Sequence, residues 1–216
     1  ANSWLKKIGE ENYGPALSTD IMRGIKNKNF WVMEEQSGPC GWEVVGRALR
    51  PGEIKLWTYQ TMAHGAEAVV YFRWRTCLFG TEQYWHGILD HDGKPRRRYN
   101  EIKEIGSTFP KVSKYNINSK VAADIFMIRD FEQQWSHEFQ KHSWEFNYRN
   151  YLKGLYAGLY KNNYNLDVSS VETDFSKYKL VLAPAFNLMS DELKKKFEEY
   201  VRNGGNLVVT FRSGTR

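Results

Sequence analysis

The sequence predicts an α/β protein made of two consecutive units. Apolar strand-like segments alternate with amphipathic helical segments over most of the 216 residues, and the connections between them are short. One of these segments, 67–75 (EAVVYFRWR), is apolar on both faces through its first half, as a strand of a parallel sheet should be. The segment 107–119 (STFPKVSKYNINS) is weakly patterned and separates the two alternations. These three observations indicate two α/β units joined by that segment.

The first unit offers two strands and about three helices. Pro51 in the first turn and Gly65 at the end mark one helix clearly. Two strands are too few to close a sheet covered on both faces, so this unit looks cut. Its helices are expected at 17–26, 50–65 and from 97–106, and its strands at 29–35 and 67–75.

The second unit repeats the alternation with more strands. Its last helix has Ser190 as a predicted N-cap, acidic residues in its first turn and Gly204 at its end. Because the unit ends on a strand with no helix after it, we expect the chain to be part of a longer α/β protein. The expected strands are 120–128, 164–171, 178–184 and 206–211, and the expected helices are 143–163 and 190–205. The apolar stripe of the last helix, which we interpret as core, comprises Leu193, Phe197, Tyr200 and Val201.

Charge and cysteine content argue against several function classes. The net charge of +6 comes from 31 basic residues scattered among 25 acidic ones. The one dense basic cluster, 94–99 (KPRRRY), is more typical of a solvated turn before a helix than of a nucleic-acid site. Cys40 and Cys77 have no metal-ligand spacing and are expected as free thiols, and His137 and His142 as surface residues. We therefore expect no nucleic acid, metal or cofactor.

The sequence contains no signal peptide and no apolar run long enough to span a bilayer. We expect no membrane association and a cytoplasmic location.

Three clusters of polar and aromatic residues follow the C-terminal ends of the two early strands. The first is 33–35 (Met-Glu-Glu) with Trp42, the second is 73–75 (Arg-Trp-Arg), and the third is a loop with Glu82 and His86. Ligands of parallel α/β folds bind at this edge of the sheet. Acids and His bind hydroxyl groups, Trp offers a stacking surface, and Arg keeps a carboxylate ionised, so this rim predicts a neutral hydroxylated ligand.

The motifs WVMEEQSG with GW, RPGEIKLWTYQTMAHGAEAVVYFRWR and FGTEQYWHGILDHDG together resemble glycoside hydrolase family 42, the barrel β-galactosidases. The resemblance runs from about residue 17 to 106, and residues 120–216 resemble the flavodoxin-like trimerisation domain of that family. It implies the C-terminal part of a (β/α)8 TIM barrel over 1–112, including the last two barrel strands. A flavodoxin-like domain, truncated at its C-terminus, would follow over 113–216.

The resemblance also assigns roles to residues of the rim. Glu34, the Glu of the Met-Glu pair, corresponds to the nucleophile, and Trp42 corresponds to the aromatic wall of the galactose subsite. Glu82, 48 residues after Glu34, corresponds to a carboxylate that holds sugar hydroxyls. The family often has a His three residues after that Glu, where this chain has Trp85, so His86 is the remaining candidate sugar ligand.

Two neighbouring residues keep alternative interpretations. Arg73 either adjusts the environment of the nucleophile or is an ordinary ion-pair partner at the rim. Glu35 is expected to be structural, paired with Arg73 or Arg75.

The resemblance implies a retaining exo-β-galactosidase whose second catalytic acid is absent from the chain. A retaining glycosidase needs a nucleophile and an acid/base about 5 Å apart. In the family the acid/base is a Glu after Asn that precedes the nucleophile, whereas Asn100-Glu101 follows Glu34 and falls within a predicted helix. We therefore expect the isolated chain to be inactive. The implied partners are a small galactoside or oligosaccharide and, in the full-length protein, two further copies in a homotrimer.

Two other functions fit the sequence less well. One is a non-catalytic carbohydrate-binding or oligomerisation module. The other is a flavin- or nucleotide-binding protein, which is disfavoured because RDFEQQW (129–135) stands where a Gly-rich phosphate loop would be needed.

Overall fold

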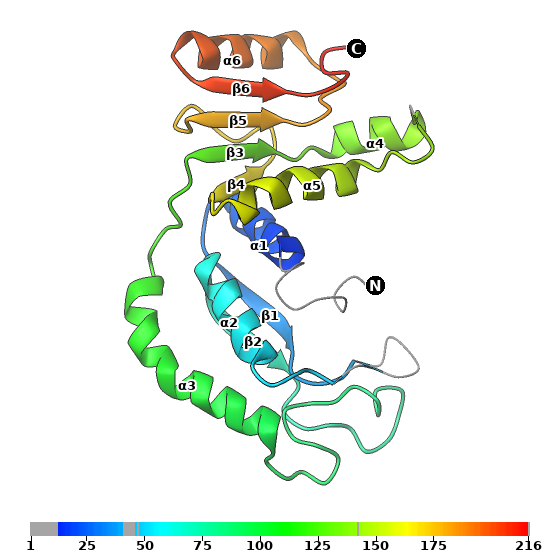
Figure 1. Ribbon diagram of the computed structural model, residues 1–216, viewed down its shortest axis with the longest axis vertical. Helices are drawn as coiled ribbons and strands as arrows, with labels where there is room; N and C mark the ends of the chain where they lie inside the picture. Colours follow the sequence, from blue (N-terminus) through cyan, green and yellow to red (C-terminus); the bar gives the residue numbers. More distant parts are fainter. Residues whose placement is uncertain (1–12, 41–45, 47, 142, 216) are drawn as a thin grey trace. The chain divides into compact units, whose positions relative to one another are not determined.

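A computed structural model describes residues 13–40, 46, 48–141 and 143–215, and it has the α/β character that the sequence predicts (Figure 1). Within this range helices and strands alternate, except that α4 and α5 are successive helices and β4 and β5 successive strands. In chain order the elements are α1 (Tyr13–Lys26), β1 (Phe30–Gln36), α2 (Glu53–Ala63), β2 (Ala66–Phe72), α3 (Arg97–Asn116), β3 (Ile125–Ile128), α4 (Phe131–Phe139), α5 (Tyr148–Lys161), β4 (Leu166–Ser169), β5 (Leu180–Ala183), α6 (Asp191–Arg202) and β6 (Asn206–Val209).

The chain forms two compact units whose limits differ from the expected division at 112/113. Residues 29–120 form one, which we call the strand-pair unit, and residues 1–28 join 121–216 in the other, the sheet unit. The difference has two causes. Helix α1 packs on β4 and α5 of the sheet unit, and α3 continues to Asn116 through residues that we expected to be a weak connection.

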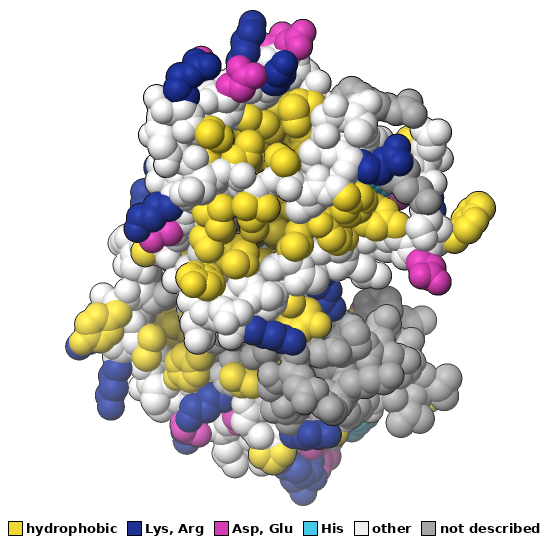
Figure 2. All heavy atoms as spheres, turned by 45° about the horizontal axis from the view of Figure 1, so that its top comes forward, with side chains coloured by type: hydrophobic (Ala, Val, Ile, Leu, Met, Phe, Trp, Pro, Cys, Tyr) yellow, Lys and Arg dark blue, Asp and Glu magenta, His cyan; other side chains and the backbone are white. Residues whose placement is uncertain are grey.

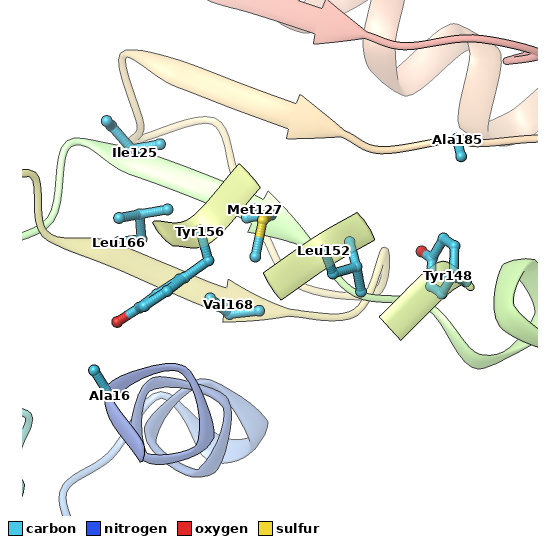
Figure 3. Close-up of a cluster of buried hydrophobic side chains, with 9 residues drawn as sticks. All are labelled: Ala16, Ile125, Met127, Tyr148, Leu152, Tyr156, Leu166, Val168 and Ala185. Atoms are coloured by element: carbon cyan, nitrogen blue, oxygen red, sulfur yellow. The ribbon is translucent and has the colours of Figure 1, made fainter. Parts of the chain in front are cut away.

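The sheet unit contains a four-stranded parallel sheet in the order β4-β3-β5-β6 (Figure 1). All four residues of the central strand β3 are buried, so both faces of the sheet are covered there. Figure 3 shows one covered face, where side chains of α1 and α5 meet those of β3 and β4. Its core residues are Ala16, Ile125, Met127, Tyr148, Leu152, Tyr156, Leu166, Val168 and Ala185. The opposite face packs against α6 and the β4–β5 connection through Phe126, Ile128, Phe175, Tyr178, Val181, Ala183, Phe186, Phe197 and Tyr200.

Helix α1 lies directly on strand β4. A Cβ atom added to Gly24 would lie 1.9 Å from the Val168 carbonyl oxygen, so only glycine permits this approach. Beside it the buried Arg23 guanidinium donates to the Asp20 carboxylate at 2.5 Å and to the Asp167 carboxylate at 3.0 Å. The phenols of Tyr156 and Tyr178 each donate to one of these carboxylates, at 2.5 Å. The contact between α1 and the sheet is therefore polar as well as apolar, and its buried charges are paired.

Several predicted helix ends of the sheet unit are confirmed. The Ser190 hydroxyl accepts from the Leu193 amide at the start of α6, and Gly204 follows the helix at φ 93°. Phe197 and Tyr200 of the predicted stripe are buried, whereas Val201 is exposed.

Helix α4 was not predicted, and the expected surface position of His137 on it is wrong. The Asp130 carboxylate caps this helix by accepting from the Gln133 amide at 3.0 Å. His137 is 2% exposed and its Nε2 lies 2.8 Å from the Ala185 carbonyl oxygen. The prediction failed because the burial of His137 depends on residues outside its own helix: the Ala185 carbonyl oxygen and the rings of Phe146 and Tyr148. His142, the second expected surface His, lies outside the described residues.

The strand-pair unit contains β1 and β2, which pair in parallel, with α2 and α3 packed together beside them. Its buried cluster is small and comprises Leu49, Ile54 and Ile105. Trp31, Met33 and Val70 lie on the strands themselves and are 66%, 66% and 44% exposed. Within the described residues, these strands thus lack cover on one face.

No helix in the described part of the chain is long and apolar enough to cross a membrane.

Figure 2 shows hydrophobic side chains gathered over much of the sheet unit on the drawn face.

Candidate active site

The two adjacent glutamates at the end of β1 occupy different environments. Glu34 is exposed, beside the exposed Met33, in a stretch where the register with β2 shifts. Glu35 pairs in register with Tyr71 and is largely withdrawn from solvent. The shift breaks the usual alternation of strand residues, so that Met33 and Glu34 are both exposed while Glu35 is half-buried.

Glu35 lies on the side of the strand pair that faces the helices. Tyr71, its neighbour across the strands, bonds through its hydroxyl to Thr58 of α2 at 2.6 Å. Burial raises the pKa of the Glu35 carboxyl from 4.5 to about 7, and the Gln36 backbone amide opposes this only in part. We expected Glu35 to pair with Arg73 or Arg75, but the described partners of the Arg73 guanidinium are other groups.

Arg73 follows the last residue of β2 and contacts Glu82 in the loop after that strand. Its Nη1 donates to Oε2 of Glu82 at 2.5 Å, and its Nη2 donates to the Cys77 sulfur at 2.5 Å. Its guanidinium also lies 5.2 Å from the centre of the Phe72 ring. Of the two interpretations of Arg73, the geometry thus supports the ion pair at the rim. The partner in that ion pair is Glu82, a predicted sugar ligand.

The loop that carries Glu82 is closed at its base. The buried Thr76 hydroxyl donates to the Leu89 carbonyl at 2.7 Å and accepts from the Gly87 amide at 2.9 Å. The Arg73 carbonyl accepts from the Ile88 amide at 2.7 Å. A Cβ atom on Gly87 would lie 2.4 Å from that carbonyl, so the closure requires glycine.

The loops after β1 and β2 contact each other through His86. Its amide donates to the Pro39 carbonyl at 2.9 Å, and a Cβ on Gly38 would lie 2.5 Å from the His86 carbonyl. Desolvation, with the neighbouring His91, lowers the pKa of the imidazole. A neutral imidazole offers one donor and one acceptor, which suits a hydroxyl ligand.

The structure therefore brings four of the five predicted site residues to one edge of the strand-pair unit. These are Glu34, Arg73, Glu82 and His86, whereas Trp42 lies outside the described residues. Cys40, which precedes the undescribed stretch, has a thiol pKa raised by burial and by the nearby Glu34 carboxylate.

Arginines of the basic cluster at 94–99 form ion pairs within the chain. Arg96 pairs with Asp90 and Asp92, Arg97 with Glu101, and Arg98 with Asp90. Arg98 also donates through Nε to the Gly87 carbonyl, and so supports the Glu82 loop. Among the described residues no group of three or more His, Cys, Asp or Glu side chains is arranged to hold a metal ion.

Sequence reasoning missed two contributors to the site. Cys77 was interpreted only as a free thiol, although its sulfur accepts from Arg73. Thr76 was not singled out, because a threonine after a strand carries no signal that its hydroxyl will bond to backbone groups 11 and 13 residues later.

Two family models match consecutive parts of the chain. Residues 3–112 match the family model of the glycoside hydrolase 42 β-galactosidase, and residues 123–216 match the model of the β-galactosidase trimerisation domain.

Curated relatives and solved structures extend the match over both units. The chain is 34% identical over 208 residues to β-galactosidase BgaA of Clostridium cellulovorans, covering 96% of this chain and 32% of that protein. It is 35% identical over 201 residues to β-galactosidase BgaH of Haloferax lucentense, covering 93% of this chain and 29% of that protein. The chain thus spans about a third of the length of these relatives.

Crystal structures show the same similarity in three dimensions. The β-galactosidase of Bacillus circulans sp. alkalophilus matches with a TM-score of 0.90 and 32% identity, over 97% of this chain and 31% of that one. A catalytic mutant of Gan42B from G. stearothermophilus matches with a TM-score of 0.90 and 29% identity, over 98% of this chain and 32% of that one. The chain therefore belongs to the glycoside hydrolase 42 family of β-galactosidases and comprises part of the catalytic barrel followed by the trimerisation domain.

Proposed function

We propose that the chain is the nucleophile-bearing part of a retaining exo-β-galactosidase that hydrolyses terminal β-D-galactosides. The observation that carries the proposal is the separation of Glu34 from Glu35. Glu34 is exposed at a strand end, while Glu35 is half-buried on the helix side with a pKa raised to about 7. A nucleophilic carboxylate must be accessible and ionised; Glu34 is the accessible one of the two acids, and the raised pKa of Glu35 disfavours its ionised form.

The neighbouring groups support a galactoside as the substrate. Glu82 and His86 belong to a loop whose ends are held by hydrogen bonds, and the His86 amide donates to the Pro39 carbonyl of the loop after β1. We assign both residues, with Trp42, to the sugar subsite. No redox or metal group takes part in the proposed double displacement.

The second catalytic carboxyl must come from outside this chain. Glu101, the Glu that follows Asn100, is hydrogen-bonded to α2: its Oε1 accepts from the Lys55 amide at 3.1 Å. It is therefore not available as the acid/base, and the isolated 216-residue chain should not turn over.

We further propose that the sheet unit assembles with two other copies of the same protein. Phe131, Trp135 and Phe139 recur every four residues along α4 and are 51%, 52% and 91% exposed, and Trp144 beyond the helix is 92% exposed. A cluster of exposed aromatic side chains is typical of protein interfaces. The occupant we assign is a second copy, because the matched family model is a trimerisation domain.

This assignment is tested by the oligomeric state of the full-length protein. Phe139→Ser with Trp135→Ser should shift a trimer to monomer in sedimentation, whereas Val201→Ser, at a 48% exposed apolar position on α6, should leave the trimer intact. A trimer that survives the α4 double variant contradicts the assignment.

The catalytic proposal is tested with an aryl β-galactoside. The full-length protein should hydrolyse it, Glu34→Gln should reduce kcat by at least about a thousandfold, and the matched Glu35→Gln should retain most of the activity. The alternative, a non-catalytic carbohydrate-binding or oligomerisation module, predicts galactose binding without turnover in the full-length protein. Hydrolysis by the isolated chain, lost in Glu34→Gln, would contradict the need for an external acid/base.

A further inference from the structure

We infer that Arg73, held in place by Cys77, is a positioning residue that orients the Glu82 carboxylate toward a sugar hydroxyl. The inference rests on the proposed galactosidase function and adds to it a determinant of substrate affinity. Of the two interpretations of Arg73, it takes up the ion pair at the rim and not an effect on the nucleophile.

The geometry of the guanidinium carries the first step. Arg73 is a planar fork, and two of its arms are used in different directions: Nη1 on Oε2 of Glu82 and Nη2 on the sulfur of Cys77. The ring of Phe72 lies beside the same group at 5.2 Å. A planar group held at one arm by Cys77 and flanked by an aromatic ring has little freedom to rotate, so it fixes the carboxylate on its other arm, that of Glu82.

The second step concerns what remains free on Glu82. Its side chain is 51% exposed, so without a partner it would sample several rotamers in solvent. Arg73 engages Oε2 and leaves Oε1 to accept from a ligand. An ionised carboxylate only accepts hydrogen bonds, which matches a hydroxyl donor on the sugar.

The backbone of Arg73 makes the substitution of its side chain a fair test. The carbonyl of Arg73 accepts from the Ile88 amide, and the Thr76 bridge closes the same loop independently. Removal of the guanidinium therefore releases Glu82 but leaves the base of the loop closed.

The described contacts separate this role from an effect on the nucleophile. Arg73 contacts Glu82 and Cys77. The Glu34 carboxylate, in contrast, raises the pKa of the Cys40 thiol. Loss of Arg73 should thus raise KM for the galactoside and leave the acidic limb of the kcat pH profile in place.

The experiment uses the full-length protein and a nitrophenyl β-galactoside. Arg73→Met should raise KM on the order of 10- to 100-fold with less than about a threefold change in kcat, and Arg73→Lys should restore part of the affinity through a single hydrogen bond. The matched control is Arg75→Met, which removes an arginine from the same strand end, where no ion pair is described for it. Cys77→Ser, which keeps an acceptor, should stay closer to wild type than Cys77→Ala.

A double-mutant cycle decides between positioning and general destabilisation. Glu82→Gln alone should raise KM, and Arg73→Met added to it should raise KM little further, since both variants disable one unit. Additive effects of the two substitutions, equal effects of Arg75→Met, or a loss in kcat with a shifted pH profile would overturn the inference while leaving the galactosidase function intact. A full-length protein that does not hydrolyse galactosides at all would overturn both. If Arg73→Met does not fold, Arg73→Lys and the Cys77 pair give the same comparison.

Discussion

The two units of this chain differ in how completely their strands are covered. In the sheet unit the central strand β3 is buried at every position, and apolar clusters lie on both faces of the sheet. In the strand-pair unit one small cluster is buried, and Trp31 and Met33 of β1 are two-thirds exposed. The candidate catalytic residues all lie in the less covered unit. Stability and chemistry are therefore divided between the two units, and substitutions should separate them.

The largest expected effect comes from the buried ion network between α1 and the sheet. Arg23→Met leaves Asp20 and Asp167 buried without their cation, which should lower the free energy of unfolding by about 3–5 kcal/mol. Denaturant unfolding of the 216-residue chain measures this loss.

The control is the exposed pair of the same unit, Lys179 and Asp124. Lys179→Met should cost less than about 1 kcal/mol, because both partners are solvated. Equal losses at Arg23 and Lys179 would mean that α1 does not depend on its polar contacts with the sheet.

A smaller effect, visible only as a function of pH, is expected at Glu35 in the strand-pair unit. Its pKa is about 7 in the folded chain and near 4.5 when unfolded, so the folded state binds the proton more tightly. This contribution to stability is present below pH 4.5 and is lost as the pH rises to about 7, amounting at most to roughly 3 kcal/mol. Glu35→Gln should remove that dependence and melt at a higher temperature than wild type at pH 8.

Thermal melting of both proteins between pH 4.5 and 8 tests this directly. Glu67→Gln serves as the control, since Glu67 lies on β2 of the same unit and its pKa is lowered by hydrogen bonds to Asn29 and Asn118. The contribution of Glu67 to stability should have the opposite pH dependence, because it is lost on acidification, and Glu67→Gln should remove it. Parallel pH profiles for wild type and Glu35→Gln would contradict the burial of that carboxyl.

The smallest effect is expected for an exposed aromatic residue of β1. Trp31→Ala should change the stability of the isolated chain by no more than about 0.5 kcal/mol, because the side chain is 66% exposed. In the full-length protein the same substitution should cost several times more, since we propose that further barrel elements cover this strand. Calorimetry of both forms makes the comparison, and equal small losses would argue against such cover.

The sequence predicted those parts of the fold that depend on local patterns. Ser190, Gly204 and the apolar run of β3 are local signals, and the structure places them as expected. Helix α4 and the burial of His137 were missed, because the burial depends on the distant Ala185 carbonyl. Long-range packing of this kind leaves little trace in a single sequence.

The candidate site shows the same limit. The family motifs indicated which residue types would gather, and the structure brings Glu34, Glu82 and His86 to one edge of the strand-pair unit. The pairing of Arg73 with Glu82 and Cys77 could not be predicted, because it depends on how the loop between them folds back.

The assignment of Glu34 as the nucleophile of a retaining enzyme is tested most directly by chemical rescue. In the full-length protein, Glu34→Ala removes the nucleophile and leaves space for azide, while the external acid/base still activates an aryl galactoside. The account predicts that azide restores turnover and that the product is the α-galactosyl azide, since a single displacement inverts the β-configuration. Rescue that yields the β-azide, or Glu34→Ala that retains wild-type hydrolysis while Glu35→Ala loses it, would contradict the assignment.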